Sequence, residues 1–294
     1  MPSYGPTTLL RPKDVDEAVK LLREYGTSAR LVAGNTTIYE LVAQGALVDI
    51  DCLIDITHAG LSYVKERENG ISIGAATTFA EMARSPVLER PEYFAIKETA
   101  KKLTPPQVRN MGTLGGALCS GIPFYDMPTT MLALGARLRI ATTEGERELN
   151  VEEFFLDYFM TAVSPEEILT EARVEGNLNT GTAFVKLGRT SSDFAVVNAA
   201  ARVVLDSSKK RIEETRIALG AVANKPVRME MAEGALEGKV VSKDVILRAA
   251  KEAATMEPTA SIHASSDYKK RVIPVLVRDA LLSAVSRAGG SAES

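Results

Sequence analysis

A run of glycines between residues 107 and 121 constrains the fold of this chain more than any other feature. Residues 107–117 read Gln-Val-Arg-Asn-Met-Gly-Thr-Leu-Gly-Gly-Ala, and they follow Pro105-Pro106, where a preceding helix must stop. The run lacks the Gly-Lys-Ser/Thr ending of a P-loop. It also lacks the Gly-x-Gly-x-x-Gly spacing and the strand-to-helix context of a Rossmann fingerprint. The sequence therefore predicts neither of these nucleotide-binding folds.

The same run has the chemistry of a ligand-binding loop. The pair Gly115-Gly116 allows a ligand to approach the backbone closely. Asp126, which follows the run, can accept hydrogen bonds from a ribose or from a ring N–H. A glycine-rich hairpin that binds nothing is the alternative, and these residues alone leave both interpretations open.

A second glycine turn lies closer to the N-terminus. Residues 31–38 read Leu-Val-Ala-Gly-Asn-Thr-Thr-Ile, which predicts a strand that ends at Gly34 and a helix that starts near Thr36. The N–H groups and the dipole of a helix N-terminus favour an anion such as a phosphate. An ordinary strand-to-helix turn capped by Thr36 is the alternative, and it is the commoner outcome for a short glycine motif on its own. Two such loops in one α/β domain suit a dinucleotide better than a mononucleotide.

The composition excludes several other classes. The 294 residues carry 35 Lys and Arg against 38 Asp and Glu, a formal net charge of −3, so no footprint for nucleic acid or an anionic membrane is predicted. Two cysteines are too few for a disulfide framework or for an iron–sulfur cluster, which takes about four thiolates. Two histidines disfavour a His-rich metal site. No signal peptide and no apolar stretch of roughly 20 residues is visible, so a cytoplasmic chain without a membrane span is expected.

The hydrophobic periodicity predicts an α+β chain with two domains. A strand-and-helix alternation over about residues 1–57 predicts a small α/β unit, and the pattern changes from Leu61 onward. The second domain is expected over residues 178–288, with three strands followed by helices near 226–237, 242–255 and 266–287. Residues 289–294 are expected to form a tail.

Three stretches of sequence together resemble a known family. LVAGNTT, QVRNMGTLGGAL followed by PFYDMP, and FVKLGRTSSDFAVVNAAARV occur in the order and spacing of the FAD-binding medium subunits of molybdenum hydroxylases, the family of xanthine dehydrogenase and aerobic carbon monoxide dehydrogenase. The later stretch SSDYKKRVIPVLVRDAL is similar to the closing helix of that family, so the resemblance covers nearly the whole chain. It implies a two-subdomain FAD-binding domain of the vanillyl-alcohol-oxidase-like (PCMH) type over residues 1–177, with subdomains of about 1–57 and 58–177. A smaller α+β domain with a three-stranded sheet and helices would follow.

The resemblance also implies which residues bind FAD. The first loop would cradle the pyrophosphate with Leu31, Val32, Ala33, Gly34, Asn35, Thr36, Thr37 and Ile38. The second loop and the acidic residue beyond it would contact phosphate and ribose with Thr113, Leu114, Gly115, Gly116, Ala117 and Asp126. The positions implied to lie against the flavin are Leu103, Leu169, Lys186 and Phe194. Two departures are Gly34-Asn35, where many members have two glycines, and Ala117, where an asparagine often stands. No catalytic side chain and no metal ligand is implied.

The implied activity is that of an oxidoreductase subunit that transfers electrons. FAD would be bound by this chain, whereas a molybdenum cofactor and [2Fe–2S] clusters would be held by a large and a small partner subunit of a heterotrimer. Electrons would pass from the clusters to FAD and then to an external acceptor such as NAD+ or a quinone. Two alternatives remain open: a stand-alone flavin reductase of the UDP-N-acetylenolpyruvoylglucosamine reductase type, and a non-catalytic nucleotide-binding scaffold.

Overall fold

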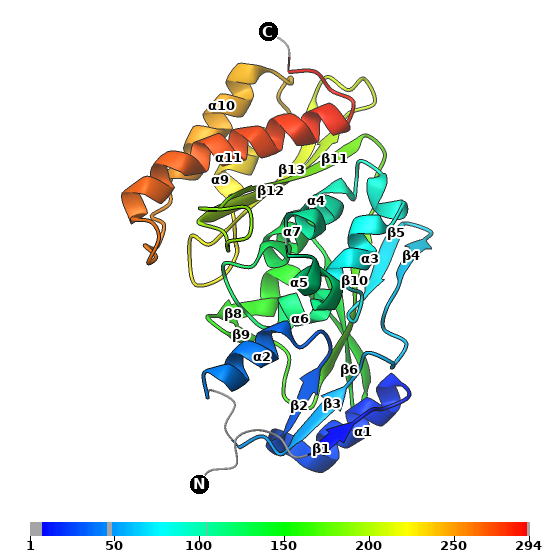
Figure 1. Ribbon diagram of the computed structural model, residues 1–294. Helices are drawn as coiled ribbons and strands as arrows, with labels where there is room; N and C mark the ends of the chain where they lie inside the picture. The colour runs from blue at the N-terminus through cyan, green and yellow to red at the C-terminus, as the bar shows by residue number, and fades with distance from the viewer. Residues whose placement is uncertain (1–7, 46–48, 104, 293–294) are drawn as a thin grey trace.

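The computed structural model describes residues 8–45, 49–103 and 105–292. Figure 1 shows three units, one above another: an N-terminal unit in blue, a central unit in cyan and green, and a C-terminal unit in yellow to red. Each unit contains both helices and strands, and much of the chain consists of runs of successive strands or successive helices, which confirms the predicted α+β class.

The N-terminal unit is a three-stranded parallel sheet with strands in the order β1-β3-β2. The elements are β1 (Thr8–Leu10), α1 (Val15–Tyr25), η1 (Gly26–Ser28), β2 (Ala29–Val32), α2 (Thr36–Ala43) and β3 (Cys52–Asp55). α1 begins where the Asp14 side chain accepts a hydrogen bond from the Glu17 amide, and it ends at Gly26, whose φ is 55°. Its buried face includes Leu22, which belongs to the same apolar cluster as Ile54 of β3.

The central unit is built on an antiparallel five-stranded sheet with the order β4-β5-β10-β6-β7. Its elements are β4 (Val64–Arg67), β5 (Gly70–Gly74), α3 (Phe79–Arg84), η2 (Val87–Glu89), α4 (Phe94–Lys102), α5 (Pro106–Met111), α6 (Leu114–Cys119), α7 (Asp126–Leu134), β6 (Arg137–Thr142), β7 (Gly145–Asn150), α8 (Val151–Phe154), β8 (Phe155–Asp157), β9 (Met160–Thr161) and β10 (Ile168–Glu175). Alternate residues of the strands, such as Ile71, Ile73, Leu138 and Ile140, pack with residues of the helices in one core.

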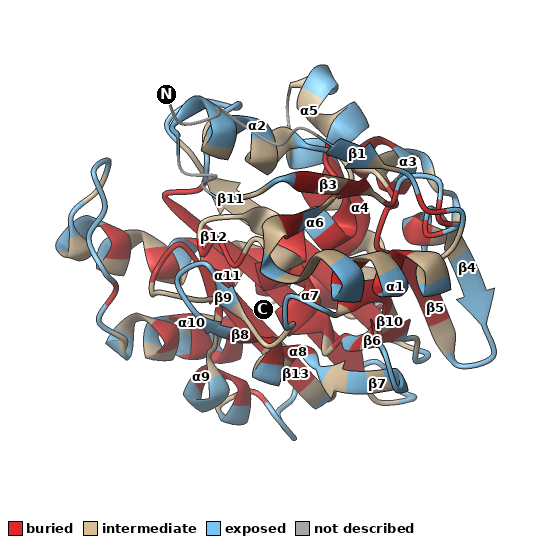
Figure 2. Cartoon of the chain, turned by 90° about the horizontal axis from the view of Figure 1, so that it is seen from below, coloured by how far each residue is buried: buried red, intermediate tan, exposed pale blue. Residues whose placement is uncertain are grey.

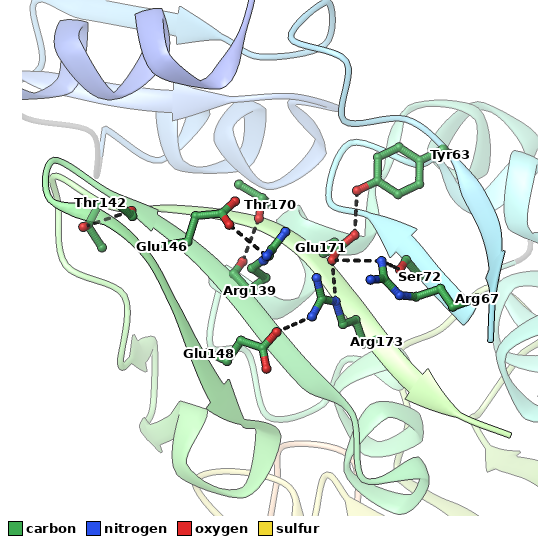
Figure 3. Close-up of polar contacts among 11 residues, drawn as sticks. Tyr63, Arg67, Ser72, Arg139, Thr142, Glu146, Glu148, Thr170, Glu171 and Arg173 are labelled. Atoms are coloured by element: carbon green, nitrogen blue, oxygen red, sulfur yellow. Dashed lines mark hydrogen bonds and ion pairs between the residues drawn. The ribbon is translucent and has the colours of Figure 1, made fainter. Parts of the chain in front are cut away.

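The other face of this sheet carries charged side chains that pair with one another (Figure 3). The Glu171 carboxylate accepts hydrogen bonds from the Tyr63 hydroxyl at 2.8 Å and from the Arg173 Nε at 2.6 Å. Arg173 also pairs with Glu148 on β7, and Arg67 donates to Ser72 across the β4–β5 pair. The alternation of apolar and polar residues along each strand therefore separates the core from a polar outer face.

Helix α7 lies at the centre of the molecule and is buried along nearly its whole length (Figure 2). All residues from Met127 to Leu134 are buried, because α7 contacts α4 on the central side and β12 (Val197–Leu205) and β13 (Ile212–Gly220) on the C-terminal side. A helix that is apolar on all sides must be covered on all sides. Asp126, its first residue, therefore lies at the boundary between two units.

The C-terminal unit is an antiparallel sheet with the order β11-β12-β13-β14. Its other elements are β11 (Thr180–Leu187), β14 (Val227–Arg228), α9 (Glu230–Gly234), α10 (Lys243–Glu252), η3 (Ala253–Thr255) and α11 (Ser266–Arg287). The expected sheet of three strands is corrected to four, because the two residues of β14 pair with Ala218 and Leu219 of β13. The unpaired backbone groups of an edge strand can pair with such a short strand. Residues 226–237 were expected to be helical, but the first part of this segment forms β14 instead.

The long helix expected at residues 266–287 is confirmed as α11, which lies across β11 and β12 (Figure 1). Beyond it, the Gly290 amide donates to the Val285 carbonyl at 3.0 Å, with Gly289 at a φ of 86°, which closes the helix. Of the expected tail, residues 289–292 are described and 293–294 lie outside the described residues. Over the described ranges, the structure contains no helix with the length and apolarity that a membrane crossing requires.

Candidate flavin site

A cavity of about 830 Å³ opens where all three units meet. Its wall is formed by β2 and the start of α2, by α4 to α7, and by residues at the end of β11 and beyond it. The volume lies within the range of about 300–1,000 Å³ that is typical of cofactor sites.

The structure brings nearly all of the residues implied by the resemblance to this cavity. Those that line it are Leu31, Val32, Ala33, Gly34, Asn35, Thr36, Thr37, Ile38, Leu103, Thr113, Gly116, Ala117, Asp126, Leu169, Lys186 and Phe194. Leu114 and Gly115 do not line it. Leu114 is completely buried in the core, and a Cβ on Gly115 would lie 2.8 Å from the Cβ of Ala75, so both residues hold the loop against β5 and its continuation.

The first loop presents the start of α2 to the cavity. Asn35 stands at the N-cap in the left-handed region, with φ 58°, and its side chain makes no capping hydrogen bond. Thr36 is the first helical residue and does not cap the helix, contrary to the alternative considered from the sequence. The first amides of a helix have no partner within the helix. Since residues 34–37 line the cavity, these N–H groups can serve an anionic ligand there.

The second loop forms two short helices, α5 and α6, and not the glycine-rich hairpin considered from the sequence. Its backbone amides are used to hold the loop: Leu114 donates to the Thr77 carbonyl at 3.0 Å, and Gly115 to the Ala75 carbonyl at 2.7 Å. Gly116 donates to the Thr113 hydroxyl, which caps α6. The amides of Leu114, Gly115 and Gly116 are therefore used within the protein and are not available to a ligand.

Gly116 shapes the wall of the cavity. It is exposed, and a Cβ at this position would meet only the Thr113 hydroxyl oxygen, at 3.0 Å. A side chain here would project into the cavity. The glycine therefore leaves a small open space beside the backbone, the cradle at Gly116, which a Cβ would partly fill.

A charged pair lies at the boundary of the central and C-terminal units. The Lys186 Nζ donates to the Asp126 Oδ2 at 2.7 Å, and the side chains are 9% and 10% exposed. The Asn198 amide nitrogen donates to the other carboxylate oxygen of Asp126 at 2.8 Å. Burial raises the pKa of Asp126, whereas Lys186, Asn198 and Lys102 act in the opposite direction. The pair therefore presents a compact, nearly neutral polar group to the cavity.

Three aromatic rings meet at one side of the cavity. The ring of Phe194 lies against that of Tyr125, with centroids 5.6 Å apart and planes at 23°, and against that of Phe124 at 5.0 Å. The Tyr125 hydroxyl lies 3.1 Å from the Thr37 hydroxyl, so this cluster also touches the first loop. Phe194 keeps 51% of its surface exposed, whereas Tyr125 and Phe124 are partly buried.

Tyr125 and Asn198 belong to this site but were not among the residues predicted from the sequence. Tyr125 directly precedes Asp126 in the stretch PFYDMP, but only Asp126 was predicted to contact the cofactor. Asn198 carries a readable signal, because it is a polar residue within a strand that is otherwise almost entirely apolar. Cys119 also lines the cavity, and burial raises its pKa to about 12, so its thiol is not poised as a nucleophile.

The residues of the cavity fit a flavin dinucleotide. The uncapped start of α2 suits a pyrophosphate, the cradle at Gly116 admits a close ligand, and the aromatic and aliphatic walls suit a planar ring. The cavity spans both loops, as a ligand with two ends requires.

Comparison with known proteins agrees with this geometry. Residues 5–174 match the model of the FAD binding domain in molybdopterin dehydrogenase, and residues 182–284 match that of the CO dehydrogenase flavoprotein C-terminal domain. The chain is 33% identical over 279 residues to the carbon monoxide dehydrogenase medium chain of Hydrogenophaga pseudoflava, covering 94% of this chain and 96% of that protein. It is 29% identical to the 6-hydroxypseudooxynicotine dehydrogenase complex subunit alpha of Paenarthrobacter nicotinovorans, covering 95% of each.

A solved structure shows the same fold. The carbon monoxide dehydrogenase of Hydrogenophaga pseudoflava that lacks the Mo-pyranopterin moiety of its cofactor matches with a TM-score of 0.90 and 32% identity, covering 98% of this chain and 99% of that chain. The chain therefore belongs to the FAD-binding flavoprotein family of the molybdenum hydroxylases. Within that family it is of the medium-subunit type: an oxidoreductase subunit whose cofactor is FAD.

Proposed function

We propose that this chain takes electrons from [2Fe–2S] clusters of a small partner subunit and passes them, through its FAD, to an external acceptor such as NAD+ or a quinone. Substrate would be hydroxylated at a molybdenum cofactor in a large partner subunit. The single observation that carries the proposal is the cavity itself, which joins both glycine loops, the Lys186–Asp126 pair and Phe194 in one space.

The residues of the cavity would divide the work of holding the cofactor. The start of α2 would bind the pyrophosphate, and the open space at Gly116 would accommodate the part of FAD next to the pyrophosphate. Asp126 and Lys186 would fix polar groups of the cofactor from the side of the C-terminal unit. Bound FAD supplies the redox chemistry, in which it can exchange electrons with both one-electron and two-electron partners.

The protein would supply orientation and exclusion of water. The aromatic cluster of Phe124, Tyr125 and Phe194 would shield one side of the cavity from solvent, and the apolar Leu103 and Leu169 would line another part. Lys186 and Asp126 are held by each other, and Asn198 holds the second carboxylate oxygen, so the pair is a fixed polar group of the cavity wall. The arrangement suits cofactor tuning better than acid–base catalysis.

FAD titration of the full chain is the first test. The visible spectrum and the flavin fluorescence should show saturable binding of about one FAD per chain and loss of colour on reduction with dithionite. FMN, which lacks the adenylate half, should bind much more weakly, because the cavity spans both loops. Equal affinity for FMN would contradict the assignment of the loops to a dinucleotide.

Purification of the tagged chain from its native host tests the partners. The chain should bring down two further polypeptides, with iron, acid-labile sulfide and molybdenum in the complex. Oxidation of the reduced complex by NAD+ or by a soluble quinone then identifies the acceptor. Recovery of a chain that is loaded with FAD, turns over a substrate of its own and has no metal-containing partner would instead favour a stand-alone reductase.

A further inference from the structure

A chain of hydrogen-bonded polar side chains leads from the cavity into the protein interior. Lys186 and Asp126 line the cavity, whereas Asn198 and Thr129 do not line it and have no exposed surface. Asp126 and Thr129 belong to α7, and Lys186 and Asn198 belong to β11 and β12, so the chain crosses the boundary between the central and C-terminal units. We call these four residues the polar chain.

Hydrogen bonds fix the orientation of every group in the polar chain. The Thr129 hydroxyl donates to the Asn198 Oδ1 at 2.8 Å, so the amide nitrogen must point the other way. That nitrogen donates to the Asp126 Oδ1 at 2.8 Å, and Lys186 donates to the Asp126 Oδ2 at 2.7 Å. Each carboxylate oxygen of Asp126 therefore has its own donor, one neutral and one charged.

The neighbouring strand is shaped around the same hydrogen bond. Gly220 of β13 pairs with Asn198, and a Cβ on Gly220 would lie 2.2 Å from the Thr129 hydroxyl oxygen and 2.3 Å from the Asn198 Oδ1. Any side chain at position 220 would separate the two groups. Helix α7 and strands β12 and β13 therefore all accommodate the Asn198 side chain, although Asn198 does not itself line the cavity.

We propose that Asn198, oriented by Thr129, is a positioning residue that holds the Asp126 carboxylate charged and correctly turned for FAD. The inference rests on the proposed function, because it takes Asp126 to be a cofactor contact. Asn198 suits the task because an amide donates a hydrogen bond to a buried carboxylate without adding a charge. The groups that face Asp126 from the surrounding elements are the neutral Asn198 of β12 and the cations Lys186 of β11 and Lys102 of α4.

The consequence of losing Asn198 is a change in how FAD binding depends on pH. Burial already raises the pKa of Asp126, and the Asn198 hydrogen bond is one of the few contacts that oppose this. Without it, the pKa of Asp126 rises further, so the carboxylate that accepts hydrogen bonds from the cofactor is lost at a higher pH than in the wild type.

Two substitutions at one position should give pH profiles of opposite sign. N198L removes the donor at similar volume, so FAD affinity should fall as the pH is lowered from 8 to 6, and it should fall more steeply than in the wild type. In N198D the new carboxyl can donate to Asp126 only when it is protonated, so its FAD affinity should improve as the pH falls. T129V leaves the amide without its orienting donor and should show a weaker form of the N198L profile.

A matched control separates positioning from loss of a buried hydrogen bond. Thr182 is also fully buried, and it links the same two units: its hydroxyl accepts from the Ala95 amide and donates to the Pro91 carbonyl, and none of these three residues lines the cavity. T182V should lower the melting temperature and leave the pH profile of FAD binding the same as that of the wild type. Dissociation constants from flavin fluorescence and the midpoint potential of bound FAD are measured on folded full-length chains.

The outcomes discriminate clearly. A wild-type chain that binds FAD, with N198L and N198D pH profiles the same as its own, would overturn this inference and leave the proposed function standing. A T182V profile identical to that of N198L would overturn it as well, since the effect would then be general destabilisation. A wild-type chain that takes up no FAD would overturn the inference and the proposed function together.

Discussion

The carbonyl oxygen of Met111 occupies the space that a side chain at position 34 would need, because a Cβ on Gly34 would lie 1.7 Å from it. Gly34 belongs to the first loop, and Met111 is the last residue of α5, the first of the two short helices of the second loop. The two loops are therefore packed backbone against backbone. Contact between the loops alone requires a glycine here, whether or not a ligand approaches.

G34A should destabilise the fold by about 2–3 kcal/mol, because the new methyl group must push the two loops apart. Thermal and urea unfolding of the full chain measure this loss. FAD affinity should fall as well, since both walls of the cavity move. A variant with wild-type stability would show that the loops are not in contact in solution.

G116A makes the contrasting case, because its Cβ would meet only the Thr113 hydroxyl oxygen and the open cavity. Stability should stay within about 1 kcal/mol of the wild type, since alanine is also the better helix former. FAD affinity should nevertheless fall, because the methyl group enters the cradle. Unchanged binding in the same titration would remove Gly116 from the cofactor site.

K186M should destabilise the protein by about 3–5 kcal/mol, because it leaves the Asp126 charge buried without its cation. The double variant D126L/K186M should recover most of that stability, since no unpaired charge remains, and yet bind FAD more weakly than the wild type. Urea unfolding and FAD titration of the two variants separate the structural role of the pair from its binding role. Full FAD affinity in the double variant would argue that the pair is structural only.

R287M should loosen the C-terminal unit from the central one. The Arg287 guanidinium at the end of α11 makes hydrogen bonds of 2.6–2.7 Å to both carboxylate oxygens of Glu98 and to the Thr182 carbonyl, and it stacks over the Phe94 ring. A loss of about 2–4 kcal/mol is expected from breaking this partly buried pair. Limited proteolysis should then cut between the units faster, and a wild-type cleavage rate would contradict the prediction.

E171Q should weaken the protein at neutral pH and lose that effect in acid. Burial raises the pKa of Glu171, but hydrogen bonds from Tyr63 and Arg173 outweigh it, so the pKa is lowered overall (Figure 3). A lowered folded-state pKa contributes stability that is present above the unfolded pKa of about 4.3 and is lost as the pH falls through the folded value. Urea unfolding at a series of pH values should therefore show the wild type and E171Q converging below about pH 4.

Local signals in the sequence were enough to predict many elements. Ser265 caps α11 by accepting a hydrogen bond from the Tyr268 amide, and Asp14 caps α1 in the same way, so both helices begin where a nearby polar residue sets the start. The elements that were not predicted depend on contacts with other segments of the chain. β14 exists because β13 has an open edge, and the glycine run forms short helices because its amides find the carbonyls of Ala75 and Thr77.

The sequence by itself determined the class of the protein and the two loops, and nearly all of the residues that it singled out line the cavity, because motif order and spacing are written along the chain. Only the tertiary structure decided how Asp126 is held. Its partners Lys186 and Asn198 lie 60 and 72 residues away and meet it because α7 is buried against the C-terminal sheet. A cap or turn depends on neighbours within a few residues, whereas the charge of a buried carboxylate depends on whatever the packing brings against it.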